Sequence, residues 1–372
     1  MDFLHKLIFD ENPRNVQKTN KMNGSGGMEN CIIKPFGRTV NGDTVDQILI
    51  SDGAGNTASL INYGASLHSL WITASDGNTI DVCLGYDTLA EYEASSSCFG
   101  GTMGRCTGRI SGASVMLSGT EYKLSENRKG YHMHGGFTGF HKKVWTYKTV
   151  PNGVCFTYFS RDGEEGYPGN LCARVTYRWV DKGTLSLIYD CVSDKETIIN
   201  LTNHSYFNLN GHETGSALEH RLSILSNTVA ETAQDNIPTG KFLSVTNTPV
   251  DFRQTCTIGS RIDTDCELIK KCGGYDHAYI LTEAFAPVAI LTGEKSGITM
   301  TVLTDLPALG FYSANALAVQ PGKNNAVYGP RHGVCLETQY MPDGANLVDF
   351  SPKPIFGAEE RMTGKTLFQF SI

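Results

Sequence analysis

The side chains best suited to proton transfer and to binding hydroxyl groups lie in five short clusters. These clusters contain Arg105 and Arg109, His132 and His134, Asn203, His204 and Tyr206, Asp276 and His277, and Glu337. Residues 200–209 alternate hydrogen-bonding and apolar side chains, the pattern of a strand that buries one face and offers the other to a polar ligand. Gly135 and Gly136 would let a loop pass close to a ligand while His134 points toward it.

Glu337 is the candidate base among these residues. It stands alone in the short apolar run 335–339, where burial would raise its pKa toward a catalytically useful range. One imidazole and one carboxylate can transfer protons, and the arginine, aspartate, asparagine and tyrosine side chains can bind hydroxyl groups. This set suits proton transfer on a neutral polyhydroxy ligand. Local sequence also allows a surface charge for Arg109, a structural role for His134 and a solvated strand face for Glu337.

Motifs for other chemistries are absent from the sequence. Residues 100–105 are rich in glycine but lack the lysine and the following helix of a phosphate-binding loop. There is no G-x-S-x-G elbow and no H-E-x-x-H motif. The 10 histidines and 11 cysteines match no common ligand spacing. We therefore expect neither a metal nor a cofactor.

Charge and composition exclude several classes of protein. With 31 Lys+Arg against 38 Asp+Glu, the net charge of −7 argues against a nucleic-acid partner and against attraction to anionic lipid. No apolar stretch approaches the roughly 18 residues of a spanning helix, and the N-terminal segment is a poor signal peptide. An odd number of cysteines without paired spacing indicates reduced thiols, so a cytoplasmic location is expected.

The elements that must position the clusters are β-strands. Short runs rich in β-branched and aromatic residues recur between turn signals, for example at 47–50, 69–73, 154–159 and 185–189. Helical periodicity is nearly absent, apart from a single turn at 89–92. This texture predicts an all-β protein with one large sandwich-like domain over 31–372, whose site lies in a groove or at loop ends. Residues 1–30 are polar, end in a Gly/Ser-rich segment and are predicted to be a flexible extension.

Taken together and in order, the clusters resemble the aldose 1-epimerase (galactose mutarotase) family. The segments that carry the resemblance are 108–110, 134–136, 162–169, 200–209, 276–277 and 336–339. The asparagine-rich histidine segment at 200–209 and the turn Asp-Gly-Glu-Glu-Gly-Tyr-Pro-Gly at 162–169 are its most specific parts.

The resemblance implies a single β-supersandwich domain of the galactose mutarotase type. Such a protein is an isomerase that interconverts the α and β anomers of a free aldohexose, such as galactose or glucose, without a cofactor. By the resemblance, Glu337 is the general base and His204 the general acid. The implied sugar-binding residues are Arg109, His134, Asp276, Tyr206 and Gly108. The expected partner is the sugar alone, and the expected assembly is a monomer or a homodimer.

Anomerisation fits this assignment chemically. The C1 hydroxyl must lose a proton and the ring oxygen must gain one, and a carboxylate and an imidazolium on either side of these atoms can do both. His204 then has to be protonated when the sugar enters, and we expect Asp276 or Glu337 to favour that state.

The sequence departs from the family pattern at two glycines. Gly108 stands where the family usually has asparagine, and Gly310 where it often has glutamine. Because glycine offers no side-chain amide, we expect a comparatively high KM and expect Gly310→Gln to lower it. If a neighbouring side chain supplies the amide that is missing at position 310, Asn315 is the expected residue.

Two alternative functions remain open on the sequence. A hexose-6-phosphate 1-epimerase of the same fold would need additional basic residues for the phosphate, and Arg105 is the candidate. A non-catalytic sugar-binding module would keep the groove, but it would need neither the acid His204 nor the base Glu337.

Overall fold

Three large antiparallel sheets form most of the protein, shown here as a computed structural model that describes residues 31–372. The extension predicted for 1–30 lies outside the described residues. The N-terminal sheet has the order β1 (Cys31–Arg38), β2 (Thr44–Ser51), β3 (Thr57–Ile61), β4 (Ser66–Thr73) and β5 (Thr79–Asp81). The central sheet has the order β11 (Thr146–Val150), β12 (Gly153–Ser160), β13 (Leu171–Asp181), β14 (Thr184–Ser193), β29 (Arg361–Ser371), β23 (Thr299–Thr304), β22 (Pro287–Thr292), β17 (Arg221–Ile224) and β20 (Cys256–Thr257). The third sheet has the order β19 (Pro238–Ser244), β18 (Thr228–Thr232), β21 (Asp276–Ile280), β24 (Ala308–Tyr312) and β27 (Cys335–Gln339).

Short ladders and single helical turns connect these sheets. The two-stranded ladders are β6 (Thr102–Met103) with β16 (Thr202–Asn203), β7 (Arg109–Ser111) with β10 (Tyr131–Met133), β8 (Ser114–Leu117) with β9 (Thr120–Lys123), β15 (Thr197–Ile198) with β28 (Ile355–Phe356), and β25 (Gln320–Pro321) with β26 (Val327–Tyr328). Among the described residues, the α-helices are α2 (Leu89–Ala94) and α3 (Glu267–Lys270), and the 3-10 turns are η1 (Phe140–Lys142), η2 (Glu164–Gly166), η3 (Gln234–Asn236), η4 (Ile258–Ser260) and η5 (Lys323–Asn325). Within 31–372, no helix combines the length and the apolar character that a membrane crossing requires.

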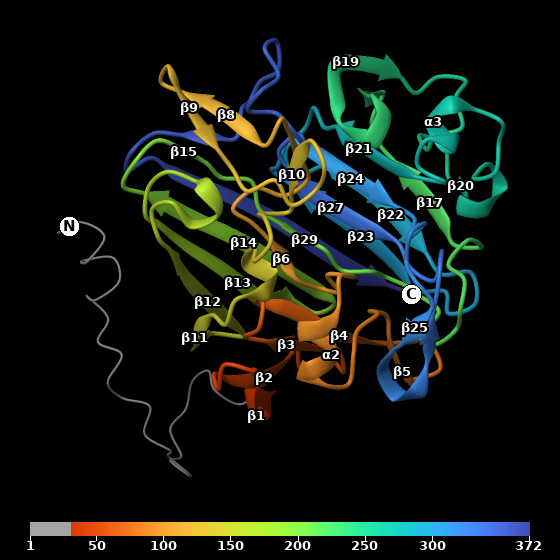
Figure 1. Cartoon of the computed structure of the whole chain (residues 1–372). Helices are drawn as coiled ribbons and strands as arrows, with labels where there is room; N and C mark the ends of the chain where they lie inside the picture. Colours follow the sequence, from red (N-terminus) through yellow and green to blue (C-terminus); the bar gives the residue numbers. More distant parts are fainter. Residues whose placement is uncertain (1–30) are drawn as a thin grey trace.

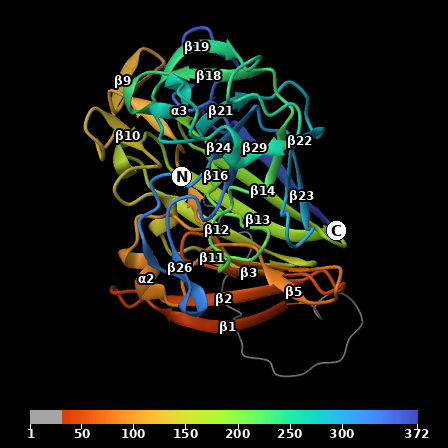
Figure 2. The same ribbon diagram turned by 90° about the vertical axis from the view of Figure 1, so that its right-hand side faces the viewer.

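The prediction of an all-β protein is confirmed. The predicted strands at 47–50, 69–73, 154–159 and 185–189 fall within β2, β4, β12 and β14, and the predicted helical turn falls within α2. Figure 1 shows the central sheet crossing the middle of the molecule, with the N-terminal sheet below it. In Figure 2 the strands β18, β19 and β21 of the third sheet lie at the opposite end from β1 and β2.

One continuous apolar core joins the three sheets into a single domain. Along β29, residues from Met362 to Phe370 alternate between buried and partly or fully exposed positions, as a strand with one face on the core requires. The core contains Ile50 of the N-terminal sheet, Trp179 and Leu187 of the central sheet and Phe311 of the third. The Trp179 indole also donates to the carbonyl of Ile50 at 3.0 Å, which ties the first two sheets together.

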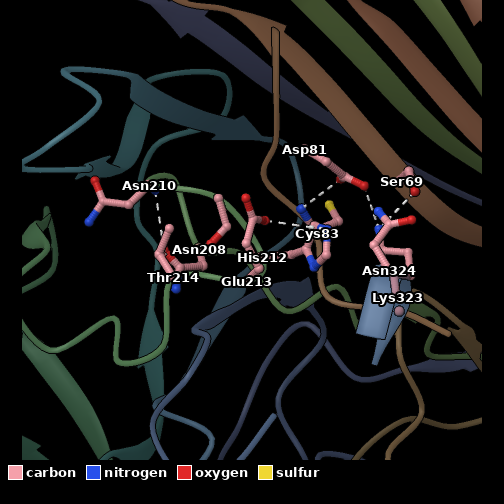
Figure 3. A network of polar contacts seen from close by, with 12 residues as sticks. Ser69, Asp81, Cys83, Asn208, Asn210, His212, Glu213, Thr214, Lys323 and Asn324 are labelled. Carbon is pink, nitrogen blue, oxygen red and sulfur yellow. Dashed lines mark hydrogen bonds and ion pairs between the residues drawn. The ribbon is translucent and has the colours of Figure 1, made fainter. Parts of the chain in front are cut away.

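A buried ion pair anchors the β25–β26 hairpin to the N-terminal sheet. The Lys323 ammonium lies 2.6 Å from the Asp81 carboxylate and donates to Ser69 Oγ at 2.7 Å (Figure 3). Both charged side chains are almost completely buried. At the start of the hairpin, Gln320 accepts from the Tyr86 hydroxyl and donates to Ser97 Oγ. The anchor thereby fixes a segment that forms one wall of the groove described next.

Candidate active site

A groove of about 720 Å³ opens at the third sheet, and every sequence-predicted site residue lines it. The predicted residues are Gly108, Arg109, His134, His204, Tyr206, Asp276 and Glu337. They come from separate parts of the chain. Arg109, Asp276 and Glu337 lie on β7, β21 and β27, whereas His134 follows β10 and His204 follows β16. The fold therefore gathers residues up to 229 positions apart around one cavity large enough for a sugar.

The candidate acid and base face each other across 3.7 Å. This distance joins His204 Nε2 to Glu337 Oε1, and both side chains are buried. Burial raises the pKa of Glu337 to about 8, with a further upward contribution from the charge of Asp276 and an opposing one from Arg109. Burial also lowers the pKa of His204 to about 4, against an upward pull from Asp276. Between these values the pair holds one proton, and in the free protein that proton is on Glu337.

The expected protonation of His204 therefore needs correction. Asp276 does favour the charged imidazole, but removal of the ring from water disfavours it more strongly. A carboxylic acid beside a neutral imidazole carries the same total number of protons as a carboxylate beside an imidazolium. The reactive charge distribution is thus one internal proton transfer away and requires no proton from solvent.

Packing fixes the orientation of the His204 ring. The ring stacks on Tyr206 with centroids 5.1 Å apart, and His134 meets its edge at 5.4 Å. Cys335 Sγ lies 3.5 Å from Nδ1. A proton on Nδ1 can be donated to this sulfur, which leaves Nε2 without a proton and facing Glu337, so that Nε2 can accept the Glu337 proton.

Arg109 and Asp276 form an ion pair on the groove wall. Arg109 Nη2 lies 3.3 Å from Asp276 Oδ2, which also accepts from the Asn236 amide at 3.0 Å. Arg109 Nε is buried and has no hydrogen-bond partner among the described residues. A buried donor without a partner is costly to keep, so this Nε is available to a ligand oxygen.

The glycine at 108 has a local structural reason. Its φ of +72° favours glycine, and a Cβ atom there would lie 2.9 Å from Pro342 Cβ, so an asparagine would fit badly. Its backbone N–H donates to His134 Nδ1 at 3.2 Å. Burial lowers the pKa of His134 well below its ordinary value, which keeps the ring neutral. With Nδ1 accepting, the proton of His134 is on Nε2 and can be donated to a ligand.

Sequence reasoning missed Gln339. Its side chain is 4% exposed and lines the groove, and its Oε1 has no partner within the described part of the chain. A Cβ atom at Gly310 would lie 2.7 Å from Gln339 Nε2, so the amide lies over the glycine. The sequence does contain a signal for this residue. Gln339 is two positions from Glu337 on one strand, and residues at that spacing share a face.

Two residues named in the sequence analysis have other roles in the structure. Asn315 does not fill the space at Gly310, because its amide donates to the carbonyls of Cys272 and Tyr275. Arg105 is 1% exposed, and its guanidinium donates to Ser160 and to the carbonyls of Pro168 and Arg161. It does not line the groove, so its suggested role in holding a phosphate is wrong.

Comparison with known proteins gives a consistent result. The sequence model of a family described as aldose 1-epimerase matches residues 46–369. Galactose mutarotase from Mus musculus is 36% identical over 84% of this chain and 90% of its own length. Aldose 1-epimerase from Escherichia coli K12 is 32% identical over 87% of this chain and 94% of its own.

Solved structures show the same fold. A GalM/aldose epimerase homologue from C. elegans superposes with a TM-score of 0.81 at 27% identity, covering 87% of this chain and 98% of its own. Galactose 1-epimerase from Lactobacillus acidophilus also gives 0.81, at 28% identity and covering 92% and 98%. The predicted fold of the galactose mutarotase type is thereby confirmed.

Proposed function

The chain belongs to the aldose 1-epimerase family, and we propose how the residues of its groove carry out the reaction. The protein is an isomerase that interconverts the α and β anomers of hexoses. The assignment of roles rests on one observation: His204 and Glu337 are buried 3.7 Å apart in a groove that also contains two polar atoms, Arg109 Nε and Gln339 Oε1, without partners in the described part of the chain.

Glu337 acts as the base and His204 as the acid in the ring-opening direction. The C1 hydroxyl donates to Glu337, which stabilises the carboxylate, and the ring oxygen accepts from Nε2, which stabilises the imidazolium. These contacts draw the proton of the pair from Glu337 to His204. Glu337 then takes the C1 hydroxyl proton while His204 protonates the ring oxygen, and the C1–O5 bond breaks. Each group contributes roughly 10²–10⁴-fold to the rate.

Ring closure uses the same pair in reverse. After rotation about C1–C2 in the open aldehyde, Glu337 returns its proton to the C1 oxygen and His204 withdraws the proton from the C5 hydroxyl. The C5 oxygen attacks the other face of the carbonyl, and the opposite anomer forms. The pair ends with the proton count with which it began, so no external proton donor is consumed.

The surrounding groups hold the sugar for this exchange. Arg109 donates from its free Nε, Asp276 accepts from a hydroxyl, and neutral His134 donates from Nε2. Gly108 brings the backbone close beside His134, and Tyr206 stacks on the His204 ring and supports it. Gln339 supplies the side-chain amide that Gly310 lacks. Fixing C1 and O5 between acid and base in this way contributes to the rate by orientation.

Polarimetry of freshly dissolved sugar tests the function. Catalytic amounts of protein are expected to speed the approach of α-D-galactose and α-D-glucose to anomeric equilibrium. Glucose 6-phosphate is the comparison substrate, and catalysis confined to the phosphate would identify a hexose-6-phosphate epimerase instead. Sugar binding without any acceleration would identify a binding module.

We also propose a cytoplasmic location and a monomer or homodimer. All 11 cysteines are unpaired, and reduced thiols are typical of a cytoplasmic protein. Cell fractionation tests the location, and light scattering of the purified protein tests the assembly.

A further inference from the structure

Three potential metal ligands lie close together at the groove, and two of them, His204 and Glu337, line it. His204, Cys335 and Glu337 each offer one donor atom, and these atoms lie within 4.8 Å of one another. All three side chains are buried. Cys335 and Glu337 are two residues apart on β27 and so point to the same face, while His204 follows β16. The cysteine has no part in the proton transfers of the reaction.

We propose that this cluster binds a thiophilic divalent ion, zinc above all, and that the bound ion reversibly inhibits the enzyme. The inhibition rests on the proposed function, because the ion would occupy the acid and the base together. The binding itself rests only on the three donor atoms.

The three donor atoms lie within 4.8 Å of one another, somewhat farther apart than the ligands of a tetrahedral zinc site. Bond lengths of about 2.3 Å to sulfur and 2.0–2.2 Å to nitrogen and oxygen separate tetrahedral ligands by about 3.3–3.6 Å. Cys335 Sγ is 3.5 Å from one nitrogen of His204, and Glu337 Oε1 is 3.7 Å from the other. Only one nitrogen of the His204 ring can bind the ion. Whichever of the Cys335 sulfur and the Glu337 oxygen lies farther from that nitrogen must move by about 1 Å, which a side-chain rotation provides.

The donor set selects the kind of ion. A thiolate with an imidazole and a carboxylate suits zinc, whereas magnesium and calcium prefer oxygen ligands alone. Binding displaces the thiol proton of Cys335 and the carboxyl proton of Glu337 to solvent, so both groups become charged ligands. The cation beside the cluster, Arg109, is already paired with Asp276 at 3.3 Å. The fourth position opens to the groove, where water completes the coordination.

Zinc binding is tested directly on the full chain by calorimetry after dialysis against chelator. We expect one zinc ion per chain, and we expect Cys335→Ser to weaken binding by roughly tenfold or more, the scale of metal-site mutations. Cys98→Ser is the matched control, because this thiol lines the same groove but is outside the cluster. Cobalt as a probe should give a thiolate charge-transfer band in the wild type and in Cys98→Ser, but not in Cys335→Ser.

Activity in zinc-buffered solution tests the inhibition. Zinc is expected to inhibit wild type and Cys98→Ser alike, competitively with galactose, and magnesium is expected to have no effect. Each variant is compared with its own rate without zinc. The absence of stoichiometric zinc binding, or binding unchanged in Cys335→Ser, would overturn the site. Zinc binding at the cluster without inhibition would overturn the inhibitory role. A protein with no epimerase activity would refute the proposed function, but the results on zinc binding would still stand.

Discussion

Replacing Gln339 with leucine should raise KM for galactose several-fold and leave kcat nearly unchanged. The amide lies over Gly310 in the groove, and its Oε1 has no partner among the described residues. A neutral hydrogen bond contributes about 0.5–1.5 kcal/mol, which corresponds to a roughly 2- to 12-fold change in KM. A hydroxyl remote from C1 changes little during ring opening, so its loss weakens ground state and transition state equally.

The same substitution should not destabilise the fold. Leucine has nearly the size of glutamine, and it removes a buried oxygen that no group within residues 31–372 satisfies. The free energy of unfolding, measured in urea, is therefore expected to stay the same or to rise. A lower stability would show that the amide has a structural partner, and the KM effect could then not be assigned to the sugar.

The position of Gln339 also reverses the expectation for Gly310→Gln. A side chain at 310 would start 2.7 Å from Gln339 Nε2 and would displace that amide, so the single variant should not lower KM. The double variant with Gln339→Ala moves the amide to the other strand and should recover the wild-type KM in part. Initial rates by polarimetry over a range of α-D-galactose concentrations give both constants. An unchanged KM in Gln339→Leu, or a collapse of its kcat, would refute this reasoning.

Three further predictions concern the catalytic pair, the buried ion pair of Lys323 and Asp81, and the independence of catalysis from metal. With EDTA present, kcat/KM should follow a bell-shaped pH profile. It should fall below about pH 4, where His204 and Glu337 are both protonated, and above about pH 8, where neither is protonated. A profile that still rises at pH 9 would contradict the one-proton state. Lys323→Met leaves Asp81 buried without its cation and should cost about 3–5 kcal/mol of unfolding free energy, with partial recovery in the double variant with Asp81→Asn. Full activity should survive EDTA and exhaustive dialysis, and recovery only on adding a divalent ion would reveal a catalytic metal.

Local pattern was enough to predict the strands and most of the groove. The runs of β-branched and aromatic residues within β2, β4, β12 and β14, and the many turn signals, depend on neighbouring residues, so they are visible in one sequence. At 200–209, however, the structure has only the two-residue strand β16 and buries every residue, so the prediction of a strand along this segment is wrong. Glu337 was recognisable as a buried carboxylate because it stands within an apolar run. The resemblance then supplied the pairing of Glu337 with His204, and the structure places the two 3.7 Å apart.

Features set by contacts distant in sequence could not be predicted. Lys323 and Asp81 are 242 residues apart, and nothing around either residue indicates a buried ion pair. No ligand spacing in the sequence marks the proposed metal-binding cluster, because His204 and Cys335 are 131 residues apart. The balance between burial and Asp276 that keeps His204 neutral likewise depends on how deeply the groove is enclosed, which only the folded chain determines.

The turnover of Glu337→Gln tests the proposed mechanism most directly. Glutamine has the size of glutamate but cannot accept the C1 proton, so kcat should fall by at least roughly 10²-fold while galactose binding, measured by calorimetry, stays within about tenfold. His204→Asn should show a similar loss, because protonation of the ring oxygen would pass to water. A Glu337→Gln enzyme that kept more than about a tenth of the wild-type kcat would contradict the assignment of Glu337 as the base.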